Sequence, residues 1–460
     1  MSGGPGTTGI AGIHALAQIP GWLRCRSDIV PPTSVPEDFF GVNVAPADDP
    51  DVDNYIVERL QELGLRHVRL TLLESDDSAE RLIQRLHTDG VEVLVCLVPT
   101  VEDAARMDTD AACRRRWGAF VADATERLPA TEYEIGTTAN RRRWSGFSHR
   151  SYAAAWQSAV EAVRGRDVRL AGPNVSDFEP LHNATFLALM RGSGRVPDVH
   201  TDNLFVERVV EPEAMDHRVA GRLLADTLAF NLVKKAAVLR KISTNFGIGR
   251  TYCTYNCWNV SRVARHAADP AAKQADYLVR YLVIAAASGA LDRVYWGPLV
   301  GHLDGLIDDG SGTYPASERV ARYTRIAGNS GPFRSGPAFD ALRHTVGALR
   351  GTTCVRATRP RDPVHAYDFQ QAAGGVVRAA WTRDGHRARI EDVFDDGFIS
   401  RVRVVDRCGA PCTEAVQVLS EAPLFFTADD DSPFESPVRQ SSADGDTIRN
   451  GYGEPEESAR

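Results

Sequence analysis

The sequence predicts an α/β protein in which a (β/α)8 barrel is followed by a small antiparallel β-domain. Strand-like and helix-like segments alternate through most of the chain, and this alternation predicts parallel strands joined by helices. About eight such repeats fit into about 300 residues, which favours a closed barrel over a doubly wound sheet. From about residue 352 the pattern changes to short strand-like runs split by turn residues, which predicts the second domain.

The barrel elements follow one another in a regular order. Short apolar or β-branched runs predict strands at 39–44, 67–72, 91–98, 132–135, 168–171, 198–205, 251–255 and 294–296. Apolar residues at helical spacing predict helices at 53–63, 79–87, 111–128, 152–163, 182–190, 219–246, 271–287 and 339–349. The first of these helices is expected to end at Gly64, a residue suited to a helix C-terminus.

Four regions are predicted along the chain. Residues 1–36 form an N-terminal extension rich in Gly, Pro and Thr, and residues 37–350 form the barrel. Residues 351–427 are expected to form a small β-sandwich, with strands near 354–357, 365–369, 376–381, 399–405 and 415–419. Residues 428–460 have too little apolar surface to fold, so we expect a disordered acidic tail.

Composition narrows the class of protein. The chain has 460 residues, 43% hydrophobic and 25% charged, as is ordinary for a globular protein. A net charge of −8 without a basic stripe argues against nucleic acid or an anionic membrane surface as a partner. No apolar run approaches the roughly 18 residues that span a bilayer. The first thirty residues have no recognisable secretory signal, so we expect a cytoplasmic protein.

No cofactor or metal is expected. No GxGxxG or GxxxxGK[ST] motif opens a predicted helix. The main dinucleotide- and nucleotide-binding sites are therefore not expected. Two cysteine pairs have equal spacing, Cys253/Cys257 and Cys408/Cys412, but neither has an obvious complement of further ligands. Eight cysteines in a chain of this length are also too few for a disulfide scaffold. Ordinary packing is the simpler interpretation of both pairs.

The most informative motif ends the fourth predicted strand, where barrels carry their chemistry. Residues 133–140 read Tyr-Glu-Ile-Gly-Thr-Thr-Ala-Asn. This run resembles the fourth-strand signature of clan A glycoside hydrolases, which reads aromatic-Glu-Ile-Gly-Asn-Glu-Pro-Asn. In that family the second glutamate is the general acid/base, and Thr138 holds its place here. Glu134, one layer deeper, is predicted to be a buried structural carboxylate paired with an arginine.

The seventh strand carries the second part of the resemblance. Residues 250–258 lie where the family has Thr-Glu-x-Gly-Trp, and Tyr255 stands at the place of the nucleophile. Arg69 matches the second-strand arginine that lies near the nucleophile in the family. The likeness covers about residues 38–350, and family 39-like members are the most similar. It implies substrate-binding roles for Arg69, Asn140, Trp144, Asp202, Tyr255, Trp258 and Trp296.

These replacements bear directly on the reaction. Retaining hydrolysis uses two carboxyl groups about 5–5.5 Å apart, one as proton donor and one as nucleophile. A threonine hydroxyl is no useful acid near neutral pH, and the phenol of tyrosine has a pKa near 10. The resemblance therefore implies a glycosidase-like protein without standard catalysis that binds a saccharide or glycosylated intermediate. A resemblance to proteins of bacterial cell-surface polysaccharide or lipopolysaccharide loci suggests a role in that assembly, with a protein partner there.

Two alternatives stay open. The chain could be an active glycosidase or transglycosidase of non-standard mechanism, with Tyr255 as nucleophile and Asp202 as helper. Other carboxylates near predicted strand ends are Glu74, Asp177, Glu179 and Asp304. The chain could also be a scaffold with a vestigial cleft. The charged run at residues 205–213 could cover the cleft or merely lead into the next helix.

Overall fold

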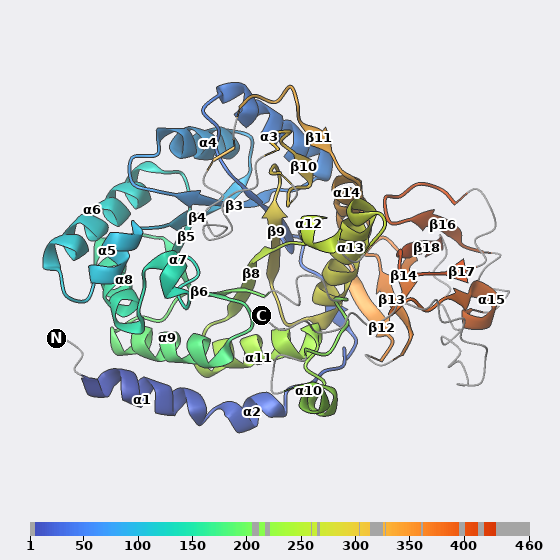
Figure 1. Ribbon diagram of the computed structural model, residues 1–460, viewed down its shortest axis with the longest axis horizontal. Helices are drawn as coiled ribbons and strands as arrows, with labels where there is room; N and C mark the ends of the chain where they lie inside the picture. The colour runs from blue at the N-terminus through green and yellow to red at the C-terminus, as the bar shows by residue number, and fades with distance from the viewer. Residues whose placement is uncertain are drawn as a thin grey trace, which may run out of the picture.

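The computed structural model has the predicted architecture, a closed barrel with a smaller β-domain beside it (Figure 1). It describes residues 5–204, 211–216, 221–258, 260–264, 267–302, 304–312, 325–326, 328–359, 362–394, 401–412 and 418–428. The acidic tail predicted from residue 428 lies, after that residue, outside the described residues. The same holds for residues 205–210 of the charged run and for parts of the predicted strands at 399–405 and 415–419.

Eight parallel strands close the barrel, and the first pairs with the last. Their interior-facing and helix-facing side chains alternate, as the period of a strand requires. The strands are β2 (Phe40–Val44), β3 (His67–Leu72), β4 (Glu92–Leu97), β5 (Glu132–Ile135), β6 (Arg169–Ser176), β7 (Val199–Asn203), β8 (Arg250–Asn256) and β9 (Arg293–Pro298).

Helices surround the barrel on its outside (Figure 1). They are α3 (Pro50–Leu63), α4 (Asp77–Thr88), α5 (Val101–Arg106), α6 (Ala111–Arg127), α7 (Arg142–Ser145), α8 (His149–Ala162), α9 (Pro180–Gly192), α10 (Arg222–Leu228), α11 (Leu232–Asn245), α12 (Val260–Val263), α13 (Pro270–Ser288) and α14 (Pro337–Leu349). Gly64 ends α3 in a left-handed conformation, as predicted. Among the described residues, no helix has the length and apolarity that a membrane span requires.

The single helix predicted over residues 219–246 is wrong, because two helices occupy this stretch. Ala229 leaves the helical region with φ +49°, which ends α10. Asn231 then begins α11, since its side chain accepts a hydrogen bond from the Lys234 amide at 3.0 Å. An asparagine at this position satisfies an amide that the helix itself leaves unpaired.

The second domain is built on a six-stranded antiparallel sheet in the order β1-β12-β13-β14-β18-β16. Its edge strand β1 comes from the N-terminal extension, so the two ends of the sequence share one sheet. The strands are β1 (Thr33–Ser34), β12 (Thr353–Ala357), β13 (Val364–Gln370), β14 (Val376–Thr382), β16 (Arg403–Asp406) and β18 (Leu424–Ala428). Smaller elements are β10 (Ile307–Asp308), β11 (Arg334–Ser335), β15 (Ala388–Arg389), α15 (Ile390–Val393) and β17 (Val418–Leu419).

The barrel and the sheet share one apolar core, which includes side chains of α13, α14 and the inner face of the sheet. A buried polar contact also crosses this junction. Arg280 of α13 donates to Glu213 at 2.9 and 2.6 Å, and the Trp381 indole of β14 donates to the same carboxylate at 2.7 Å. Burial by itself would raise the pKa of Glu213, but Arg280 lowers it to about 2. The junction therefore keeps this carboxylate ionised.

Candidate active site

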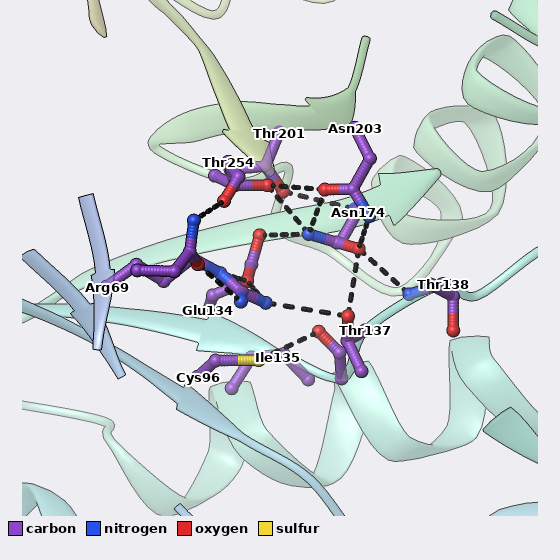
Figure 2. A network of polar contacts seen from close by, with 12 residues as sticks. Arg69, Cys96, Glu134, Ile135, Thr137, Thr138, Asn174, Thr201, Asn203 and Thr254 are labelled. Carbon is purple, nitrogen blue, oxygen red and sulfur yellow. Dashed lines mark hydrogen bonds and ion pairs between the residues drawn. The ribbon is translucent and has the colours of Figure 1, made fainter. Parts of the chain in front are cut away.

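A cluster of polar side chains fills the upper interior of the barrel, toward the carboxyl ends of its strands (Figure 2). Its members come from strands on different sides of the barrel, so the closed sheet brings together residues far apart in sequence. They are Asn43 of β2, Arg69 of β3, Glu134 of β5, Asn174 of β6, Thr201 and Asn203 of β7, Thr254 of β8, and Thr137 just after β5.

The cluster contains one ion pair. The guanidinium of Arg69 donates from Nε to Glu134 at 2.7 Å, and its Nη2 lies 2.5 Å from the same carboxylate oxygen. Glu134 is 0% exposed and Arg69 4%. The prediction that Glu134 is a buried carboxylate paired with an arginine is confirmed. A carboxylate held this way is already neutralised by its partner and is poorly suited to attack a substrate.

Asn174 links the remaining members. Its carboxamide nitrogen donates to Glu134 at 2.7 Å and to the Thr254 hydroxyl at 2.8 Å. Its carboxamide oxygen accepts from the Thr138 backbone amide at 2.8 Å and from the hydroxyl of Thr137 at 3.1 Å. Asn174 has φ +52°, a conformation that asparagine tolerates better than most residues. Asn174 could not be predicted as a site residue from the sequence, because a lone asparagine matches no motif.

The two positions of the missing glutamates lie at the edge of this cluster. Thr138, 3% exposed with φ +47°, offers a hydroxyl that has no hydrogen-bond partner among the described residues. Tyr255 lies at the end of β8 and is nearly buried. Beside it, Asn256 is 1% exposed, and both polar atoms of its side chain lack partners within the described part of the chain. Unsatisfied buried polar atoms are rare in folded proteins, and a bound ligand is one way to satisfy them.

Asp202 requires a correction, because the structure does not aim it into the barrel. It alternates with Thr201 and Asn203, which face the cluster, so its carboxyl lies on the outer side of β7. There it accepts from Asn183 of α9 at 2.8 Å. Burial raises the pKa of Asp202 well above its usual value. The β7 residue that reaches the cluster is Asn203.

The predicted aromatic platforms are also differently placed. Trp258 and Trp296 are 1% and 0% exposed, and their rings stack on each other with centroids 5.7 Å apart. Tyr281 of α13 packs edge-on against both indoles. The two tryptophans therefore pack between barrel and helices, and neither presents an open face to a sugar in this structure.

Trp144 lies apart from the cluster. It lines a cavity of about 560 Å³ beside the mouth, formed by the ends of β3 and β4 and by α5, α6 and α7. Glu74, Thr100, Arg116 and Arg143 contribute polar groups to its wall. A volume of this size is in the range of small-molecule sites.

Asn140 belongs to a second polar group at the ends of β5 and β6. Its carboxamide donates to Glu179 at 2.8 Å and accepts from the Ser176 amide at 2.8 Å. One atom of Arg141, Nη2, contacts both Asp177 at 2.6 Å and Glu179 at 2.7 Å. Two of the carboxylates noted in the sequence therefore lie close together, held by one arginine.

One cluster among the described residues has the composition of a metal site. Ligand atoms of His302, Asp308 and Asp309 lie within 4.8 Å of one another. The two aspartates also accept hydrogen bonds from the backbone amides of Gly310 and Ser311, both at 2.9 Å. These contacts account for the carboxylates as turn-forming groups.

Comparisons with known proteins extend to the fold alone. No protein-family model and no curated protein matches the sequence. The catalytic domain of GH30 xylanase C from Talaromyces cellulolyticus superposes with a TM-score of 0.52 at 11% identity, covering 86% of this chain and 98% of that one. SrfJ from Salmonella typhimurium superposes with a TM-score of 0.50 at 8% identity, covering 86% and 90%. The chain therefore has a TIM-barrel glycosidase fold.

Proposed function

We propose that this chain binds a saccharide or glycosylated intermediate at the mouth of its barrel without hydrolysing it. The observation that carries the proposal is the composition of the cluster. Its one carboxylate, Glu134, is fully buried and ion-paired, and the residues around it are neutral amides and hydroxyls. The proposal includes a place in cell-envelope polysaccharide assembly, which a resemblance to proteins of such loci suggests.

The chemistry of the mouth supports binding over cleavage. Cleavage of a glycoside by the standard route needs a proton donor and a second carboxylate close to the anomeric carbon. Thr138 and Tyr255, at the family positions of these groups, supply a hydroxyl and a phenol. The Thr138 hydroxyl and the Asn256 carboxamide supply both donors and acceptors, which is what a sugar hydroxyl requires.

A thermal-shift and calorimetry screen with oligosaccharides tests the proposal. A ligand at 100 times its Kd should stabilise the chain by about 2.7 kcal/mol. Thr138→Val keeps the β-branched shape and removes the hydroxyl, so we expect binding about tenfold weaker. Thr88→Val, at an exposed threonine that donates to the backbone at the end of α4, is the matched control and should bind normally. A broad panel without any stabilising saccharide would favour a vestigial cleft instead.

The second candidate function is glycosidase or transglycosidase activity with relocated groups. The proximity of Asp177 and Glu179, both on one Arg141 nitrogen, favours this pair over Tyr255 with Asp202, since the carboxyl of Asp202 faces α9. This alternative predicts turnover of glycosyl fluorides that Glu179→Gln abolishes. Glu161→Gln, at an exposed glutamate of α8, should leave such turnover unchanged.

A further inference from the structure

The N-terminal helix α1 (Pro5–Leu16) turns its large apolar side chains outward. Ile10, Ile13 and Leu16 are 68%, 69% and 53% exposed, whereas the small Ala11 and Ala15 face the protein. The usual helix of a globular protein has the opposite arrangement, with its large apolar residues toward the core. The short helix α2 (Ile19–Leu23) continues this surface with Leu23, which is 41% exposed.

This ridge lies on a face of unusual charge. Helices α1 and α2 lie alongside α9 and α11 (Figure 1), and Asn245 at the end of α11 donates to Gln18 at 3.0 Å. None of these four helices contains an Asp or Glu, although the chain has 61 acidic residues and a net charge of −8. Exposed basic side chains lie on or next to the helices, at Arg24, Arg26, Arg191 and Lys241, and the exposed acidic Asp28 follows Arg26.

From these two observations we infer that this face binds the surface of an anionic lipid bilayer. Apolar side chains that insert into the boundary between headgroups and acyl chains, flanked by Lys and Arg, are the requirements for a helix that lies on a membrane. The net charge of the whole chain argued against such a partner. On this face, however, exposed basic residues lie beside the apolar ridge.

A second copy of the chain is a poorer occupant. A stable protein interface takes about 20–30 residues a side, far more than this ridge supplies. A two-fold contact places the same patch on both subunits, so it would also bring the basic residues of this face toward one another. A bilayer needs neither a large matching area nor complementary side chains.

Flotation with lipid vesicles tests the inference. The full chain should float with vesicles of three parts phosphatidylcholine to one part phosphatidylglycerol. It should bind pure phosphatidylcholine much more weakly, since each basic residue near an anionic surface strengthens binding about fivefold. Salt near 1 M, which screens charges beyond about 3 Å, should also weaken binding. Lack of binding to the anionic vesicles would overturn the inference.

Two variants test which side chains of the protein contact the bilayer. Ile10→Gln with Ile13→Gln should weaken vesicle binding at least about tenfold, because two large apolar side chains no longer leave water. Both residues point away from the protein, so an unchanged melting temperature should show that the fold is retained. Val355→Gln, at a 44% exposed valine of β12, is the matched control and should bind like the parent chain. Equal binding by both variants, or self-association through the ridge in place of lipid binding, would contradict the inference.

The experiment is independent of the proposed saccharide site. Thr138→Val should bind vesicles like the parent chain, because Thr138 lies inside the barrel mouth and the ridge lies on α1. A chain that binds vesicles but no saccharide would therefore refute the proposed function alone.

Discussion

Two glutamates of one strand, Glu132 and Glu134 of β5, occupy successive inward-facing positions in the barrel, Glu132 nearer the floor and Glu134 nearer the mouth. At the floor, where the strands begin, Glu132 is surrounded by arginines. Arg169 contacts it at 2.8 Å, Arg293 at 3.5 Å and Arg250 at 3.6 Å. Nearer the mouth, Glu134 has one arginine partner among the described residues, Arg69, and its other polar neighbours there are neutral.

The two carboxylates differ in how many positive side chains compensate their charge. The floor is rich in positive charge, so its carboxylate keeps partners if one of them is lost. Within the part of the chain that the structure describes, the mouth has one counter-ion for one carboxylate, and buried polar atoms without partners, such as the Thr138 hydroxyl, lie next to it. In barrels of this class the bottom face serves stability and the top face serves function. Changes at Arg69, His67, Asn174 and Arg169 can test this contrast.

Removing the single counter-ion at the mouth should have the largest effect. Arg69→Met leaves Glu134 buried without its partner, and breaking a buried ion pair in this way costs about 3–5 kcal/mol. Urea denaturation followed by circular dichroism measures the loss. A loss below about 1 kcal/mol would show that the mouth tolerates an unpaired carboxylate, and the contrast with the floor would fail.

Lowering the pH should destabilise the folded chain through His67, at the start of β3 on the floor of the barrel. Burial, with Arg293 nearby, lowers the pKa of His67 from 6.5 to about 4. The folded chain therefore holds this histidine neutral, and its contribution to stability is present above about pH 6.5 and is lost as the pH falls toward 4. The loss should be about 3 kcal/mol at most. Unfolding free energies measured across this range for the parent and for His67→Gln should show a flatter profile in the variant. Parallel profiles would contradict this prediction.

Removing the central amide of the mouth should have a smaller effect on stability. Asn174→Ala removes the acceptor of the Thr138 amide and one donor to Glu134, which should cost about 1–3 kcal/mol. The same change should weaken saccharide binding, because it disturbs the backbone at Thr138. Denaturation and calorimetry measure the two effects. Unchanged binding with lowered stability would make Asn174 purely structural.

Removing one of several arginines at the floor should have the smallest effect. Arg169 is 44% exposed at its side chain, and Glu132 keeps Arg293 and Arg250 nearby. Arg169→Met should therefore cost less than about 1 kcal/mol in the same denaturation assay. Because it removes the same type of side chain as Arg69→Met, the pair forms a matched comparison of floor and mouth. Equal losses would contradict the account.

The repeating elements and the pairing of Glu134 with an arginine could be predicted from the sequence, because strand and helix periods and buried charges leave clear local signals. The identity of that arginine, Arg69, came from the structure. The direction in which each side chain at the mouth points could not be predicted from the sequence. A shift of one residue along a strand turns a side chain to the opposite face, and this decided between Asp202 and Asn203.

Neutral residues of the cluster were missed for a related reason. Asn174 reaches the centre because β6 and its left-handed φ place it there, and neither property is visible in the letters around it. Trp296 matched the family position, yet its ring packs against Trp258 and Tyr281. The resemblance located the strand but not the environment of the side chain.

A saccharide that binds at the mouth, as we propose, should remain intact. The most direct measurement is mass spectrometry of an oligosaccharide that the chain binds, after prolonged incubation with a large amount of the protein. Our account predicts that the oligosaccharide is recovered at its original length. Shortened or elongated products that disappear in the Glu179→Gln or Tyr255→Phe variant would contradict it.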